Sequence, residues 1–162
     1  MRRATMVWVP AGTSSRTKRP CAFVNVLIAL FDSGHVHHEV AHDWFADNHA
    51  DGWATCPLTQ SGFVRVSSNE KALPDAKTPQ EAVLLLRRIV ALPHHHFWQD
   101  DVSLATSQLF DVTRLTGYRQ VTDAHLVTLA LHRGGRLATL ERKIQSLVPR
   151  EHAATDVVCA VF

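Results

Sequence analysis

The chain has 162 residues, 46% of them hydrophobic and 20% charged, and a formal net charge of +2 at pH 7. This length and composition predict one domain with a proper core, and so small a charge gives no argument for nucleic-acid binding by itself. The cysteines Cys21, Cys56 and Cys159 are widely separated and fit neither a disulfide framework nor a zinc cluster, which indicates reduced thiols in a cytoplasmic protein. No apolar run approaches the length of a membrane span, so no membrane contact is expected.

The first residues differ in composition from the rest of the chain. Turn-forming and basic residues, among them Pro10, Arg16 and Arg19, predict a flexible basic leader over residues 1–21 that lies outside the fold. Residues 22–162 are predicted to form the domain. It opens with a nearly unbroken apolar run over residues 23–31, which indicates a buried parallel strand that runs into the start of a helix.

Apolar residues at helical spacing predict an amphipathic helix from about Val36 to Asn48. Inside it, residues 38–42 match the H-E-x-x-H pattern of zinc peptidases, in which two histidines bind zinc and the glutamate is the general base. The chain contains 11 histidines, so such a match can arise by chance, and no third-ligand pattern follows. A zinc peptidase acting through His38, Glu39 and His42 is therefore a remote alternative.

The middle of the chain alternates strands with helices. Trp53–Cys56 is predicted to be a strand, followed by a helix that Thr59 caps. The segment Thr78-Pro79-Gln80-Glu81 predicts the clearest helix of the chain, because it combines a threonine cap, a proline at the first position and a glutamate three residues after the cap. The buried face of this helix is predicted to consist of Val83, Leu86 and Val90.

The next stretch is predicted to contain another short strand and another helix. The three consecutive histidines 94–96 point in different directions along an extended chain, so they indicate a polar entry to a strand at Phe97-Trp98 rather than a metal site. Asp100 and Asp101 lie at the exit of that strand. Residues 104–115 are predicted to form a helix.

The last part of the chain contains the most informative unit. Thr122 is predicted to cap a helix that is apolar nearly all round and ends at Gly134-Gly135, and residues 137–140 then form a buried strand. Asp123 falls in the first turn of the helix, and Glu141 follows the strand. Ligands of open α/β sheets bind outside the carboxyl ends of the strands, where these two carboxylates can meet. The competing interpretation is a helix-dipole partner and an exposed strand-end glutamate.

A final strand is predicted within residues 153–162, which completes an α/β fold with a mostly parallel sheet covered on both faces. Five segments in this order make the chain similar to the VapC family of PIN-domain ribonuclease toxins over roughly residues 22–160. These segments are Phe-Val-Asn-Val-Leu-Ile-Ala-Leu (23–30), Thr-Gln-Ser-Gly-Phe-Val-Arg-Val (59–66), Phe-Trp-Gln-Asp-Asp (97–101), Val-Thr-Asp-Ala-His-Leu (121–126) and Gly-Arg-Leu-Ala-Thr-Leu-Glu-Arg-Lys-Ile (135–144).

The resemblance implies a PIN-like, three-layer α/β/α fold and the toxin of a toxin–antitoxin module. Its implied activity is cleavage of an RNA phosphodiester by an endoribonuclease that depends on Mg²⁺ or Mn²⁺. It also implies a homodimer and a cognate antitoxin whose C-terminal segment covers an acidic cleft. The basic residues that could contact RNA phosphates around the cleft are Arg65, Arg119, Arg136, Arg142 and Lys143, although a solvated surface is the better interpretation for any one of them.

The family pattern has four acidic positions, and this chain departs from it. The first position is Phe23 and the second is Gln60, whereas Asp123 and Glu141 keep the third and fourth acids. The formal charge of the site therefore falls from four negatives to two, which should weaken metal binding.

The resemblance assigns Asn25 to the catalytic set together with Gln60, Asp123 and Glu141. Asp123 and Glu141 are the predicted metal ligands, with Asp101 as a substitute for a missing acid. A catalytically degenerate PIN-fold protein that only binds antitoxin or RNA is the alternative. The match begins abruptly at Val24, which suggests the hypothesis of a frameshift or altered start at residue 23.

Overall fold

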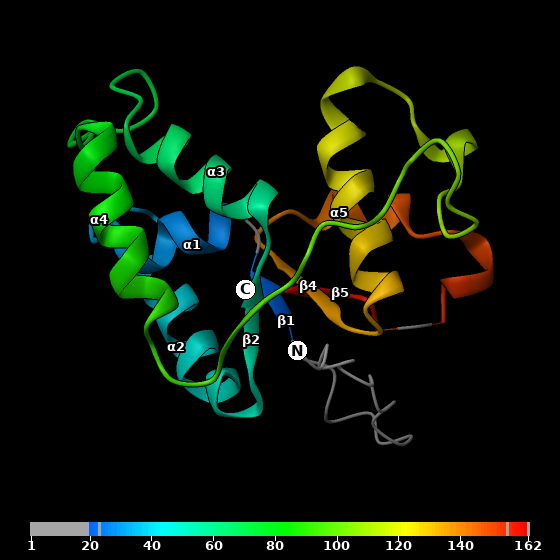
Figure 1. The fold of residues 1–162 in the computed structure, drawn as a ribbon, viewed down its shortest axis with the longest axis horizontal. Coiled ribbons are helices and arrows are strands. Elements are labelled where there is room, and N and C mark those ends of the chain that lie inside the picture. Colours follow the sequence, from blue (N-terminus) through cyan, green and yellow to red (C-terminus); the bar gives the residue numbers. More distant parts are fainter. Residues whose placement is uncertain (1–19, 23, 155, 162) are drawn as a thin grey trace, which may run out of the picture.

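The computed structural model describes residues 20–22, 24–154 and 156–161, and these residues contain a five-stranded parallel sheet (Figure 1). The order across the sheet is β3-β2-β1-β4-β5, and every neighbouring pair is parallel. The predicted α/β class with a parallel sheet is therefore confirmed. The strands are β1 (Pro20–Ala22), β2 (Trp53–Thr55), β3 (His95–Phe97), β4 (Arg136–Thr139) and β5 (Val158–Ala160).

Helices cover both faces of the sheet, with α1 to α4 on one side and α5 on the other (Figure 1). The α-helices are α1 (Val24–Phe31), α2 (His38–Asn48), α3 (Pro57–Ser67), α4 (Pro79–Val90) and α5 (Val121–His132). The 3₁₀ segments are η1 (His49–Asp51), η2 (Val112–Arg114), η3 (Tyr118–Gln120), η4 (Arg142–Leu147) and η5 (Arg150–His152). Within the described ranges, none of these helices has the length and apolar character needed to span a bilayer.

The first strand lies in the middle of the sheet, because β1 pairs with β2 on one side and with β4 on the other. Pro20 and Cys21, predicted as the end of the basic leader, thus belong to the fold, while residues 1–19 lie outside the described residues. The strand predicted over residues 23–31 is wrong from residue 24 onward, where α1 forms. Residues 26–30 are all buried, and a helix buried on every side has the same apolar run as a buried strand.

Two histidines of α2 hold the end of α1. His38 Nδ1 lies 2.8 Å from the carbonyl oxygen of Ala29, and His42 Nε2 lies 3.1 Å from that of Leu30. These carbonyls belong to the last turn of α1, where the helix has no partners of its own for them. The H-E-x-x-H match is thus explained by helix capping. No group of three His, Cys, Asp or Glu side chains in the described part of the chain could hold a metal ion, so the zinc-peptidase alternative lacks its site.

The start of α3 differs from the prediction. Pro57 occupies the first helical position and Cys56 is the N-cap, while Thr59 lies at the third position. The Thr59 hydroxyl accepts a hydrogen bond from the Cys56 N–H (2.9 Å) and donates one to the Cys56 carbonyl (3.1 Å). The prediction of Thr59 as the cap overlooked that proline begins a helix more readily than it ends a strand.

The prediction of α4 is confirmed at its start, where Thr78 and Glu81 form the reciprocal capping box. Its buried face was predicted correctly only in part. Ala82 and Ile89 are the fully buried residues and Leu86 is partly buried against the core, whereas Val83 is 38% exposed. A helix that packs on one neighbouring helix buries a narrow stripe, and the apolar residues beside that stripe stay in solvent.

The helix predicted over residues 104–115 does not form. Instead, side chains accept hydrogen bonds from backbone N–H groups two residues further along: Ser103 from Ala105, and Asp111 from Thr113. Such local bonds offer the backbone an alternative to the helical ladder. This stretch contains turns and the short η2.

Helix α5 is buried nearly all round, as predicted, and it ends at Gly134, whose φ of 59° is left-handed. Its N-cap is Gln120 rather than Thr122. Gln120 is already held by Thr116, whose N–H and hydroxyl both donate to the Gln120 side-chain oxygen (2.8 and 2.9 Å). The helix therefore begins at Val121, before Thr122, although threonine is the better capping residue.

Gly62 lets α3 approach α1. A Cβ atom at this position would lie 2.6 Å from Cγ2 of Val24, and such overpacking is destabilising. We expect Gly62→Ala to lower the free energy of unfolding by about 1–3 kcal/mol, measured by urea denaturation. Adding Val24→Ala should restore part of this loss, so the double variant loses less than the sum of the two single losses.

The matched control is Gly117→Ala, because no heavy atom lies within 4 Å of a Cβ built there and the φ of −168° is open to any residue. Its free energy of unfolding should stay unchanged or rise slightly. Equal losses at Gly62 and Gly117 would contradict the packing argument.

Candidate active site

The two carboxylates predicted to meet do lie together. Glu141 follows the carboxyl end of β4, and Asp123 lies in the first turn of α5. Burial, and after it the negative charge of Glu141, raise the pKa of Asp123 from 3.8 to about 6. Among the described residues, Asp123 has no ion-pair or hydrogen-bond partner. A half-buried carboxylate beside a second, exposed carboxylate, with no compensating cation, is a site where an added cation would be stabilised.

Asn25 holds the segment that carries Glu141. Its amide nitrogen donates to the Thr139 hydroxyl (3.3 Å), and its amide oxygen accepts from the Leu140 N–H (3.3 Å). The Thr139 hydroxyl also accepts from the backbone N–H of Glu141 (3.0 Å). Through these bonds the first turn of α1 fixes the backbone at the end of β4. Thr139 is not among the site residues predicted from the sequence, although a polar residue that ends a buried strand is a signal for such a role.

Gln60 lies in the first turns of α3, beyond the carboxyl end of β2. Its side-chain nitrogen donates to the Thr55 hydroxyl (2.9 Å), which also lies 2.9 Å from His95 Nε2. Burial, and the neighbouring His96, lower the pKa of His95, which favours the neutral imidazole there. Because the nitrogen of the Gln60 amide is used as a donor, its oxygen is the atom left for other ligands.

Strand β1 lies between β2 and β4, and one residue follows it before α1 begins. That residue is Phe23, the first acidic position of the family pattern, and it lies outside the described residues. Phenylalanine has no carboxylate, so the chain lacks the first acid of the family pattern.

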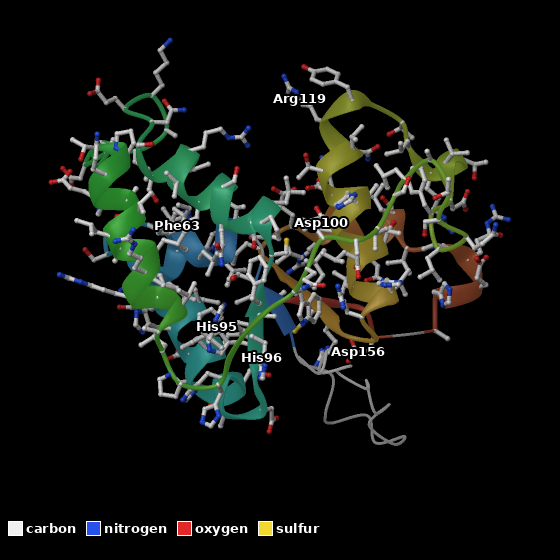
Figure 2. All side chains as sticks on the ribbon, in the orientation of Figure 1. Phe63, His95, His96, Asp100, Arg119 and Asp156 are labelled. Carbon is white, nitrogen blue, oxygen red and sulfur yellow. The ribbon has the colours of Figure 1, made fainter. Side chains whose placement is uncertain are left out.

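Asp101 does not join Asp123 and Glu141. Its carboxylate lies 2.7 Å from Arg133 Nη2 and 3.6 Å from His132 Nε2, at the far end of α5. Asp100 instead lies 2.7 Å from Nε2 of His125, against the side of α5 (Figure 2). The prediction of Asp101 as a substitute metal ligand is therefore corrected. The Arg133 guanidinium, just after α5, binds this carboxylate and compensates its charge.

The predicted RNA-contacting residues lie at different ends of the molecule. Arg136 lies at the start of β4 and pairs with Asp156 (2.9 Å), at the opposite end of α5 from Arg119 (Figure 2). Its assignment to the cleft is wrong, because the carboxylate pair lies beyond the other end of the strand. An open pocket of about 490 Å³, lined by Glu141, Arg142, Gln145, Val158 and Ala160, gives access from the solvent beside Glu141.

Comparison with known proteins agrees with this architecture. Residues 24–148 match the family model of the PIN domain, so the fold and the match define a PIN-domain protein. Ribonuclease VapC38 of Mycobacterium tuberculosis strain H37Rv is 49% identical over 124 residues, which cover 76% of this chain and 86% of VapC38. Ribonuclease VapC39 of the same strain is 44% identical over 118 residues (73% and 85% of the two chains). Ribonuclease VapC44, also of that strain, is 41% identical over 136 residues (82% and 95%).

The chain belongs to the VapC family of PIN-domain ribonucleases, the toxins of toxin–antitoxin modules. The resemblance seen in its sequence is thereby confirmed. The roles of Asn25, Gln60, Asp123 and Glu141 within this family site stay predictions.

The carboxylate pair predicts an unusual dependence of stability on pH. With a folded-state pKa of about 6 instead of 3.8, Asp123 binds its proton more tightly in the folded chain than in the unfolded chain. Stability should therefore fall as the pH rises from about 4 to about 6. Asp123→Asn removes this loss. In metal-free buffer at pH 7.5, its free energy of unfolding should exceed that of the parent by about 1–2 kcal/mol, a figure discounted for the partial exposure of Asp123. At pH 4 the two free energies of unfolding should be about equal.

Urea denaturation in EDTA at both pH values measures this difference. Asp75→Asn makes the same chemical change at an exposed carboxylate and should leave both free energies of unfolding unchanged. A gain for Asp123→Asn of equal size at pH 4 and pH 7.5 would contradict an origin in the charge of Asp123.

Proposed function

We propose that this chain cleaves an RNA phosphodiester with the help of Mg²⁺ or Mn²⁺ held by Asp123 and Glu141. The observation that supports this most is the carboxylate pair at the carboxyl edge of the sheet, where burial, and after it the charge of Glu141, raise the pKa of Asp123 to about 6. The repulsion between the two carboxylates is relieved either by protonation or by a bound cation. At neutral pH, a divalent cation relieves it while both carboxylates stay ionised.

The donor set fits a hard divalent cation. Carboxylate oxygens are the ligands that Mg²⁺ takes, and Mg²⁺ often needs only one or two of them because it keeps several waters. The amide oxygen of Gln60 is a further neutral donor at the same edge, since its nitrogen is already bonded to Thr55. When bound, such an ion activates water and stabilises negative charge on the phosphate.

The protein residues have separate tasks in this proposal. Asp123 and Glu141 supply the negative charge, and Asn25 keeps Glu141 in place through Thr139 and the backbone of Leu140. The chain lacks the first family acid, so the affinity for the cation should be lower than in a relative with four acids. Millimolar rather than micromolar metal is expected to be needed.

The family also supports proposals on partners. We expect a cognate antitoxin protein, an RNA substrate and a homodimer, and we expect the chain to act in the cytoplasm. Neither Cys56 nor Cys159 forms a disulfide within the described part of the chain, which is consistent with a reducing compartment.

The decisive test is cleavage of RNA by purified protein at 0–20 mM Mg²⁺ or Mn²⁺. We expect the parent to cleave and Asp123→Asn to lose at least about 100-fold in rate, because half of the site's carboxylate charge is removed. Phe23→Asp should raise the rate at low metal concentration by restoring a third carboxylate. Asp75→Asn should cleave like the parent.

Two results would contradict the proposal. Cleavage that persists in Asp123→Asn would point to a contaminating nuclease or another site. A silent parent with an active Phe23→Asp variant would make this chain a degenerate toxin that only binds antitoxin or RNA.

A second test uses stability instead of activity. If the metal dissociation constant is on the order of 1 mM, 10 mM Mg²⁺ should raise the melting temperature of the parent by about 3–6 °C. The rise should vanish in Asp123→Asn and in Glu141→Gln, because each removes one carboxylate of the pair. Sodium chloride at matched ionic strength is the control for general screening, and equal rises in parent and variants would exclude this pair as the binding site.

A further inference from the structure

An exposed aromatic–cation pair lies just before α5. Tyr118, the only tyrosine of the chain, is 81% exposed. The guanidinium carbon of Arg119 lies 5.7 Å from the centre of its ring, and Arg119 Nε–H donates to its hydroxyl (3.2 Å). The ring is thus held by a charged neighbour while most of its surface faces solvent.

The pair is carried by an ordered turn. Both the N–H and the hydroxyl of Thr116 donate to the side-chain oxygen of Gln120, which closes the turn around Tyr118 and Arg119. The segment η3 then passes into α5 without a break. Because the backbone on either side is fixed, the ring is presented at a defined place and little order has to be gained on binding.

The pair lies close to the acidic site. Arg119 lies in η3, four residues before Asp123 in the first turn of α5, and η3 continues directly into α5, so the two residues are about one helical turn apart. Figure 2 shows Arg119 at the free end of α5, where the helix begins. Arg119 is nevertheless not an ion-pair partner of Asp123; it is bonded to Tyr118. Its positive charge therefore remains available to a ligand that reaches the acid pair.

We propose that Tyr118 and Arg119 form a subsite for single-stranded RNA beside the cleavage site, with one unpaired base stacked on Tyr118 and a backbone phosphate held by Arg119. The inference rests on the proposed cleavage of RNA at Asp123 and Glu141. An exposed aromatic ring next to a cation is a stacking platform that accepts every base. Bases inside an RNA duplex cannot reach such a ring, so the substrate class is a single-stranded region or loop.

A protein partner on the same ring is the competing occupant. Val121, three residues after Tyr118, is apolar and 41% exposed, and the charged Arg119 and the polar Gln120 separate the two residues in sequence. The centre of a protein–protein interface is depleted of charged residues. Because a charged and a polar residue interrupt the apolar surface here, a base with its phosphate is a better occupant than a protein partner.

The test measures binding of a 12-nucleotide single-stranded RNA of mixed sequence, labelled with fluorescein, by the full chain in EDTA. Without divalent cations the RNA is not cleaved, and fluorescence anisotropy gives the dissociation constant. Tyr118→Ala should weaken binding roughly 5- to 100-fold, the range for one base stacked on an aromatic ring. Tyr118→Trp should bind within about twofold of the parent, and Tyr118→Leu should behave like Tyr118→Ala because it keeps bulk but lacks an aromatic face.

Arg119→Ala tests the phosphate contact separately. It should lower the slope of log Kd against log salt by about 0.7, the value for one phosphate contact on a single strand. The matched control is Phe97→Ala, since Phe97 is also an exposed aromatic residue (53%) but lies on the edge strand β3, with two strands between it and β4. Its RNA binding should equal that of the parent. The same sequence presented as a duplex should bind weakly, with no loss in Tyr118→Ala.

The outcomes separate this inference from the proposed function. Unchanged RNA binding in Tyr118→Ala overturns the subsite, even if the parent cleaves RNA and Asp123→Asn does not. Binding that depends on Tyr118 in a chain that never cleaves supports the subsite and contradicts the catalytic proposal. Sedimentation velocity is run on the same samples. If Tyr118→Ala loses RNA binding only because a dimer dissociates, the ring is a protein contact and the inference is overturned.

Discussion

Two like charges held together against their repulsion are the constraint on which this structure depends. Burial, and after it the negative charge of Glu141, raise the pKa of Asp123 to about 6, so the ionised Asp123 carboxylate destabilises the folded chain at neutral pH. The free energy for this comes from packing elsewhere. Asp123 is carried by a helix whose next residues are almost all buried, and it cannot withdraw without pulling α5 out of the core.

Glu141 is constrained in a different way. Its side chain is exposed, but its backbone is tied through Thr139 to Asn25 at the start of α1. The Thr139 hydroxyl is fully buried, so the bonds that it accepts from Asn25 and Glu141 satisfy a polar group that would otherwise be costly. One helix therefore places the first carboxylate and another helix places the second. Gly62, which lets α3 approach α1, brings Gln60 toward the same edge.

The sequence predicted those parts of the site that depend on local chemistry. Asp123 in a first helical turn, Glu141 after a strand and Gly134 in the left-handed conformation each follow from near neighbours in the chain. It could not distinguish a buried strand from a buried helix over residues 24–31, since both present the same unbroken apolar run.

Predictions also failed wherever a distant partner decided the outcome. The nitrogens of His38 and His42 that appeared as zinc ligands lie against carbonyl oxygens of α1, and no pattern within one helix reveals that. The sequence predicts Asp101, at the exit of a strand, as a substitute metal ligand. Arg133, which binds it, is 32 residues further along the chain and on another element.

These pairings also limit how the site can make up for its missing acids. Asp101 is held by Arg133, and Arg136 is held by Asp156 at the far end of β4, so neither charge is available near Asp123. The acidic edge is left with two carboxylates, and any cation there is held by half the charge that the family pattern supplies. In a chain with so weak a proposed metal site, binding energy for RNA has to come mainly from groups that act without a metal. Tyr118 and Arg119, on an ordered turn one helical turn before Asp123, are placed to supply it.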